Sequence, residues 1–139
     1  DIGLGIPAEP LFRSFLLINY TDEVLDFIYT SGKSVYEQGC DPEKFRKQAE
    51  NLGLSWSSFS RYFLPAFRYM REGTTFKGSL TQATNDYMLN RIYNEYGKDG
   101  LRNALKSFVG TIEYYEATGQ NKPGDRAIIQ RFQQILKNQ

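Results

Sequence analysis

Apolar side chains recur along this chain at three- and four-residue intervals, the spacing of amphipathic helices, and no convincing apolar–polar alternation of the strand type is present. Several segments show the helical spacing, and most are bounded by a capping residue, a glycine or a proline. They cover residues 10–18, 22–38, 42–52, 55–64, 99–115 and 125–136, together with a segment that opens at Ser79 or Thr81 and ends at Tyr96. The pattern predicts an all-α fold, a compact bundle of about five to eight helices in a single domain spanning residues 1–139, with residues 1–9 as an extended arm.

Local signals mark where several of these helices begin and end. Thr21 precedes two acidic residues, and Asp41-Pro42-Glu43 combines a capping side chain with a proline suited to the first helical position. Asp125 is the predicted cap of the last segment. Gly97 is placed to stop a helix, and Pro65 is expected to end or kink one, because proline lacks an N–H and clashes with the preceding turn.

Composition excludes several kinds of chemistry. The chain has no histidine and a single cysteine, so it holds no Ser-His or Cys-His nucleophile pair, no common zinc cage and no thiolate iron–sulfur cluster. Cys40 has no resolving thiol or base near it in the sequence, and Glu113 and Glu116 lack further ligands, which favours a solvated pair over a metal site. We therefore predict a protein that is not an enzyme and has no cofactor and no bound metal.

Charge is spread unevenly along the chain although its totals nearly balance, with 17 basic and 16 acidic side chains. Residues 1–40 carry a net charge of −4, residues 41–80 of +3 and residues 81–139 of +2. A basic surface for a polyanion is one explanation, and ordinary surface variation is another. The longest apolar run, residues 15–18, is far shorter than the ~20 residues of a membrane span, and a lone cysteine fits a reducing compartment, so we expect a cytoplasmic protein without a membrane partner.

Residues 45–62 carry the most specific local pattern. Ala49 is a small residue where a second helix would cross the first, and Gly53 tolerates the positive φ of a tight turn. Leu54 and Phe59 supply apolar anchors after the turn, and Ser55 can cap the second helix. With these features the segment resembles the helix-turn-helix of bacterial DNA-binding proteins. Two features depart from that pattern: Phe59 is bulkier than the usual aliphatic residue, and Pro65 would cut the second helix to roughly three turns.

The resemblance implies a set of nucleic-acid contacts. The second helix would present Ser55, Trp56, Ser57, Ser60 and Arg61 to the major groove, with Arg46 and Lys47 of the first helix on the DNA backbone. Arg61 would contact a guanine edge or a phosphate, and the serines would contact phosphates. The alternative is that the same residues form a tight helical corner in an unrelated all-α core.

Two stripes of basic residues are further candidates for nucleic-acid binding. Lys98, Arg102 and Lys106 recur at four-residue spacing on one helix, and Arg61, Arg68 and Arg71 would form a second stripe if the helix continued past Pro65. Nearby tyrosines that could stack on single-stranded bases are Tyr69, Tyr93, Tyr96, Tyr114 and Tyr115. The alternative is that the aromatic residues are core and the bases form an ordinary solvated surface.

Residues 101–108, followed by Tyr114-Tyr115, combine basic and aromatic residues in a way that is similar to the small all-helical subunit of multisubunit CRISPR effector complexes. The size and helix content of the chain are also similar to those of that subunit. That subunit lines a nucleic-acid path without doing chemistry. The resemblance implies phosphate contacts through Lys and Arg and further contacts to neighbouring protein subunits.

Together these features predict a non-catalytic module that binds nucleic acid, DNA or RNA, through Lys and Arg, with a helix-turn-helix at residues 45–64 as one route. The alternative is a protein-interaction or scaffold domain, in an oligomer or a larger complex, whose exposed Tyr, Phe and Arg side chains make the main contacts. Salt separates the two predictions, because phosphate binding weakens steeply as salt rises and an apolar protein interface changes little.

Overall fold

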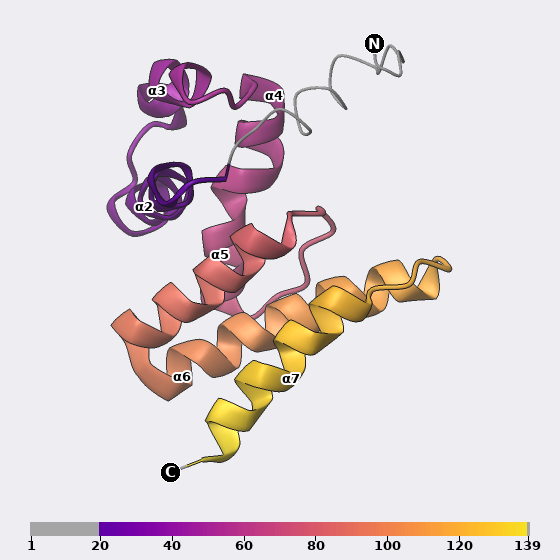
Figure 1. Cartoon of the computed structure of the whole chain (residues 1–139). Helices are drawn as coiled ribbons and strands as arrows, with labels where there is room; N and C mark the ends of the chain where they lie inside the picture. Colours follow the sequence, from indigo (N-terminus) through magenta and orange to yellow (C-terminus); the bar gives the residue numbers. More distant parts are fainter. Residues whose placement is uncertain (1–19, 139) are drawn as a thin grey trace.

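The computed structural model describes residues 20–138 of the 139-residue chain, and in this part every regular element is helical. In chain order the elements are α2 (Asp22–Gln38), the short 3₁₀ helix η1 (Pro42–Phe45), α3 (Arg46–Asn51), α4 (Trp56–Ser58), the π-helical turn η2 (Phe59–Phe63), α5 (Leu64–Glu72), α6 (Gln82–Ala117) and α7 (Pro123–Lys137). The predicted all-α fold is confirmed (Figure 1), and no helix among the described residues is both long and apolar enough to cross a membrane. The expected arm at residues 1–9 and helix at residues 10–18 lie outside the described part.

α2 begins and ends where its capping residues predict. The Thr21 hydroxyl accepts a hydrogen bond from a backbone N–H three residues on, at 3.3 Å, and Gly39 takes a left-handed conformation with φ 68°. Midway along α2, a Cβ on Gly32 would lie 2.9 Å from Phe67 Cβ and 3.1 Å from the Leu64 carbonyl oxygen of α5. Glycine weakens an isolated helix, but here it allows two helices to cross closely.

The sequence left two outcomes open at Pro65, a helix end or a kink, and the helix does not end there. α4, η2 and α5 form one continuous helical segment, residues 56–72 (Figure 1). The residues just before α5 make a π-helical turn, whose wider hydrogen bonding accommodates the missing N–H of proline. The segment therefore extends over about five turns instead of the three that a stop at Pro65 would leave.

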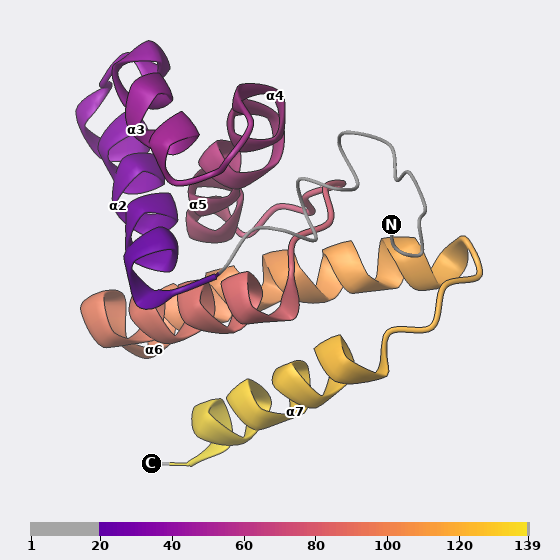
Figure 2. The same ribbon diagram turned by 45° about the horizontal axis from the view of Figure 1, so that its top comes forward.

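α6 consists of two arms that meet at Gly97. This glycine has a non-helical backbone, with φ 73° and ψ −163°, as its predicted role as a helix stop requires. A Cβ on Gly100 would lie 3.5 Å from Ile92 Cγ2, whereas eight residues of straight helix span about 12 Å, so the chain folds back on itself. We name residues 82–96 the N-arm and residues 98–117 the C-arm, and both views show the C-arm running back beside the N-arm (Figures 1 and 2).

α7 packs along α6, and the prediction that Asp125 caps this helix is wrong. The helix begins at Pro123 with Lys122 as its N-cap, so Asp125 lies inside the first turn and does not cap the helix. Proline at the first helical position has a suitable φ and loses no hydrogen bond there, which explains why the helix starts two residues before Asp125. The Asp125 side chain is only 7% exposed, and burial raises its pKa.

The core is rich in aromatic residues and lies where α2, α5 and α6 meet. Tyr29, Phe59, Phe63 and Phe67 are fully buried. The ring of Phe27 on α2 stacks on Phe59, and Tyr29 meets Phe67 edge to face, each with 5.2 Å between ring centroids. These contacts hold residues 56–72 against α2 and so fix the position of the second helix of the predicted helix-turn-helix.

Candidate nucleic-acid interface

η1, α3, α4 and η2 form a tight helical corner with the local features predicted for residues 45–62, and α4 and η2 together are its second helix. Ala49 is fully buried, and Gly53 has φ 87°. The Leu54 N–H donates to the Ala49 carbonyl oxygen at 2.9 Å and closes the turn, and Leu54 and Phe59 are buried anchors. The chain therefore has a corner of the predicted shape, which a DNA-binding helix-turn-helix and an unrelated helical core would share.

The serines of the corner differ in what they bond. Ser55 caps α4 by accepting a hydrogen bond from the Ser58 N–H at 3.3 Å, as predicted. The Ser60 hydroxyl donates to the Trp56 carbonyl oxygen at 2.7 Å. Ser57 is exposed and has no hydrogen bond from its side chain to another described residue. Of the three predicted serine contacts, Ser57 is therefore the one whose hydroxyl is unengaged.

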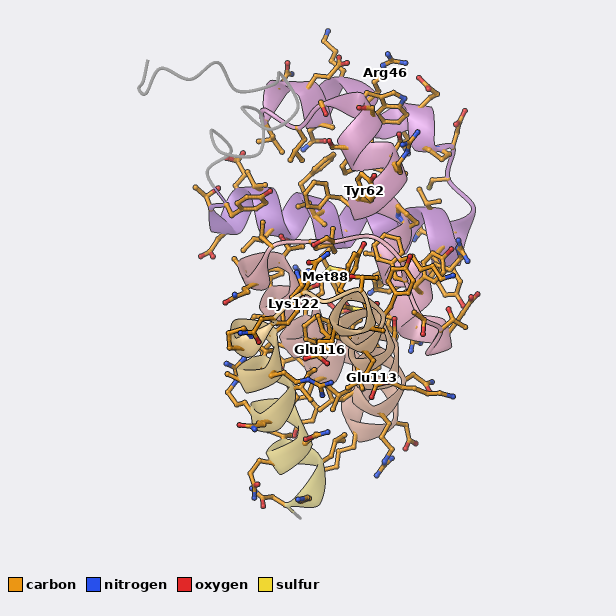
Figure 3. The ribbon with its side chains drawn as sticks, turned by 90° about the vertical axis from the view of Figure 1, so that its right-hand side faces the viewer. Arg46, Tyr62, Met88, Glu113, Glu116 and Lys122 are labelled. Atoms are coloured by element: carbon orange, nitrogen blue, oxygen red, sulfur yellow. The ribbon has the colours of Figure 1, made fainter. Side chains whose placement is uncertain are left out.

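Arg46 is held at the corner by two carboxylates and an indole ring. Its guanidinium lies 3.6 Å from Glu43 and 3.5 Å from Glu50, and 5.2 Å from the ring centre of the half-buried Trp56. Figure 3 shows Arg46 at the outer end of the molecule, beyond Tyr62. Lys47, the next residue, is exposed and has no ion pair with another described residue. Arg46 is thus already partly neutralised, whereas no carboxylate of residues 20–138 neutralises Lys47.

Arg61 differs from the other arginines of the described chain. The arginines that pair with a carboxylate are Arg46, Arg68, Arg91, Arg102, Arg126 and Arg131. The Arg71 guanidinium stacks on the Tyr96 ring, 3.7 Å from its centre. Arg61 is exposed and makes neither kind of contact with another described residue. It occupies a position on the second helix of the corner that the helix-turn-helix resemblance assigned to the major groove.

The stripe of Lys98, Arg102 and Lys106 lies on the C-arm, and its three members have different surroundings. Lys98 donates a hydrogen bond to the Asn138 carbonyl oxygen, and Arg102 pairs with Asp99 at 2.5 Å. Lys106 is exposed and has no ion pair with another described residue. The C-arm is far from α3 and α4 in Figure 1, so this stripe and the corner are separate surfaces.

The second expected stripe does not present three free cations. Although the helix continues past the proline, Arg68 pairs with Glu72 at 3.6 Å, and Arg71 lies over the Tyr96 ring. Among the tyrosines considered for base stacking, Tyr114 is exposed, and the others are partly buried.

One member of the acidic pair on the C-arm is bound by α7. Arg126 donates two hydrogen bonds to the Glu116 carboxylate, at 2.9 and 2.5 Å, and this contact lowers the pKa of Glu116. Glu113 is exposed (Figure 3). Within residues 20–138 no group of three or more His, Cys, Asp or Glu side chains is placed to hold a metal ion, and Cys40 is a partly exposed thiol.

A charged network between α2 and the N-arm was not predicted from the sequence. The Glu95 carboxylate accepts hydrogen bonds from the Tyr29 hydroxyl at 2.9 Å and the Lys33 ammonium at 2.8 Å, and Arg91 pairs with Asp26 at 2.6 Å. Partial burial acts to raise the pKa of Glu95, but the hydrogen bonds from Lys33 and Tyr29 outweigh it, and the pKa lies below its usual value. The polar spacing of Asp26, Tyr29 and Lys33 along one helix face was the available signal.

Two separate surfaces therefore carry the predicted contact residues. The corner presents Lys47, Ser57 and Arg61 without partners among the described residues, and the C-arm presents Lys106. Only this geometry supports an assignment, because no protein-family model, no curated protein and no solved structure matches the chain.

Proposed function

We propose that this chain is a non-catalytic module that binds nucleic acid, and duplex DNA above all, through the corner formed by η1, α3, α4 and η2. In this proposal Arg61 contacts a guanine edge or a phosphate, and Lys47 and Ser57 contact phosphates. The support is that residues 45–62 have the local features expected of a helix-turn-helix and carry two exposed cations, Lys47 and Arg61, that pair with no carboxylate of the described residues.

The observation that carries the proposal is that Arg61 has no partner among the described residues. An arginine beside a carboxylate is partly neutralised before any ligand arrives, as the other paired arginines are. Buried Phe59 and Phe63, on either side of Arg61, anchor the backbone that carries it. Arg61 therefore offers an anionic ligand a positive charge that no carboxylate of the described residues neutralises.

The small number of available cations predicts a modest salt dependence. Lys47 and Arg61 would neutralise two phosphates, and the exposed Lys44 of η1 is close enough in the chain to add a third. The slope of log affinity against log salt should then be roughly −2 to −3, so affinity should fall about ten- to fortyfold between about 50 and 200 mM salt.

Fluorescence anisotropy with labelled oligonucleotides tests this proposal. Duplex DNA, duplex RNA and single-stranded DNA are titrated at two salt concentrations with the wild type, Arg61→Ala and Arg68→Ala. Arg68 is a matched control, since it is exposed on the same continuous helix but is paired with Glu72 and stacked on Tyr69. We expect Arg61→Ala to weaken duplex DNA binding by roughly 1–3 kcal/mol, or to lower the salt slope by about one if the contact is to phosphate, and Arg68→Ala to resemble the wild type.

Two results would contradict the proposal. One is no binding of any oligonucleotide at low salt. The other is an equal loss in both variants, which would mean that binding depends on total charge and not on the corner.

The second candidate function is a protein-interaction or scaffold domain, and the engagement of most described arginines by carboxylates favours it. It predicts no oligonucleotide binding together with partner binding that changes little with salt.

A cytoplasmic location and membership of a larger complex remain part of the proposal. The lone Cys40 thiol supports the first, and the similarity to a CRISPR complex subunit supports the second.

A further inference from the structure

A groove runs along the C-arm of α6 between two walls. One wall is the loop that follows α5, at Gly73 and Thr75, and the other is the end of α7, at Leu136. The groove encloses about 500 Å³. None of its lining residues comes from η1, α3, α4 or η2, so the groove is separate from the corner.

Small residues allow the first wall to lie close to the C-arm. Gly110 has no room for a side chain beside the Thr75 hydroxyl, and Gly73 turns the chain with φ 73°. The loop therefore rests on the backbone of the C-arm. The shape of the groove is set by this packing.

The floor of the groove is apolar. It is formed by Leu105 and Val109 of the C-arm, and Leu136 on the α7 wall continues the apolar surface. Leu105 is nearly buried, and the other two are half-buried. From Arg102 to Glu113 the C-arm spans about 16 Å, or three helical turns, which is the length of a short helix laid along it.

Charge is distributed unevenly along the rim. Arg102 and Lys106 lie toward one end, and Glu113 lies at the other. Lys98, one turn before Arg102, adds a third cation to the basic end, where Asp99 is the neighbouring acid and pairs with Arg102. The basic end therefore keeps a net positive charge beside an apolar floor.

We propose that this groove binds an amphipathic helix of a partner protein, about three turns long, with acidic residues at one end of its apolar stripe. The stripe would cover Leu105, Val109 and Leu136, and the acidic end would meet Arg102 and Lys106. Burial of the apolar stripe supplies the affinity, and the charges set the orientation of the helix. This inference goes beyond nucleic-acid binding and does not depend on it.

The same groove is poorly suited to nucleic acid. None of its ten lining residues is aromatic, so no ring is available for a base to stack on. Glu113 would repel a phosphate chain that followed the groove, and the apolar floor offers it no partner. An amphipathic protein helix, in contrast, would pack its apolar side chains on the floor and pair its acidic side chains with the basic end of the rim.

The test uses two labelled 14-residue peptides, each held helical by a lactam bridge on its outer face. Both carry the same leucine stripe; one has glutamates in its terminal turn and the other has lysines there. Anisotropy measures their affinity for the wild-type chain, Lys106→Glu and Lys47→Glu. We expect the acidic peptide to bind at least fivefold more tightly than the basic one, and Lys106→Glu to remove or reverse this preference.

Lys47→Glu is the matched control, because it makes the same charge change at another exposed lysine, in the corner. It is expected to leave peptide affinity unchanged. Equal affinity for the two peptides, or an equal effect of both substitutions, would overturn the proposal, and so would displacement of the acidic peptide by an oligonucleotide. Peptide affinity reports on the groove and oligonucleotide affinity on the corner, so the two proposals fail separately.

Discussion

Replacing Gly32 with alanine tests the close crossing of α2 and α5. An added Cβ would lie 2.9 Å from Phe67 Cβ and 3.1 Å from the Leu64 carbonyl oxygen. Carbon atoms in ordinary contact are about 3.5–4.0 Å apart. Neither neighbouring atom is the far end of a flexible side chain, so the new methyl group forces the two helices apart by roughly 0.5–1 Å.

Two opposing effects set the size of the expected change. Alanine favours a helix over glycine by about 1 kcal/mol, which stabilises the variant. Overpacking costs about 1–3 kcal/mol, and the upper half of that range applies here because Phe67 is fully buried and cannot turn outward. The net result is a destabilisation of about 1–2 kcal/mol.

Guanidinium chloride unfolding, followed by circular dichroism, measures this difference as a lower midpoint with an unchanged m value. Ser34→Ala is the control, because Ser34 is a partly exposed residue of the same helix, two positions from Gly32 and therefore on a different face, and its replacement gains helix propensity. We expect the control to be more stable than the wild type by about 0.5 kcal/mol. If Gly32→Ala is stabilised to the same extent, the two helices do not meet at Gly32 and the reasoning is wrong.

Two further predictions concern buried or bonded carboxylates. Burial raises the pKa of Asp125, so the charged carboxylate destabilises the folded state above the raised folded-state pKa and has no effect below the unfolded-state pKa. Asp125→Asn should therefore stabilise the chain by on the order of 1 kcal/mol at pH 7 and should leave its stability unchanged at pH 3. For Glu95 the sign is reversed, because the folded-state pKa is lowered: its contribution is complete above the unfolded-state pKa of about 4.5 and is lost as the pH falls through the folded value. Glu95→Gln should therefore be less stable than the wild type at pH 7, and thermal unfolding at several pH values should show this difference shrinking toward pH 3. A gap between either variant and the wild type that stays constant with pH would contradict the corresponding assignment.

Helix ends were predictable from the sequence because capping is local. Thr21, Asp41 and Ser55 each accept a hydrogen bond from a backbone N–H two or three residues further on. Gly53 likewise supplies the positive φ of the corner without help from distant residues. Such contacts depend on a few adjacent positions, and the sequence contains all of them.

The path of the chain between those ends was less predictable. Whether Pro65 ends a helix or follows a π-helical turn depends on how Phe59 and Phe63 pack in the core. The residues that they pack against belong to elements distant in sequence, so the local sequence does not reveal the outcome. Near the start of the last helix the sequence contains two signals for a helix N-terminus, Pro123 and Asp125, and the helix begins at Pro123. Sequence alone does not rank such signals when both lie within one turn.

The corner was predicted in shape but not in the engagement of its side chains. Arg46 pairs with Glu43 and Glu50, at three- and four-residue spacing, and Arg102 pairs with Asp99. These spacings were present in the sequence and could have identified the partly neutralised arginines. Of the contacts to Glu95, only the one with Arg91, four residues earlier, could have been found in this way, because Tyr29 and Lys33 lie more than sixty residues earlier in the chain.

The reversal at Gly97 also bears on how quickly the chain can fold. Because the N-arm, the C-arm and α7 follow one another with short connections, each meets a neighbour that is close in sequence. Closing such short loops loses little chain entropy, and structures dominated by near contacts have low contact order and fold fast. We therefore expect the three consecutive helical arms within residues 82–137 to assemble early in folding, before α2 and α5 dock on them.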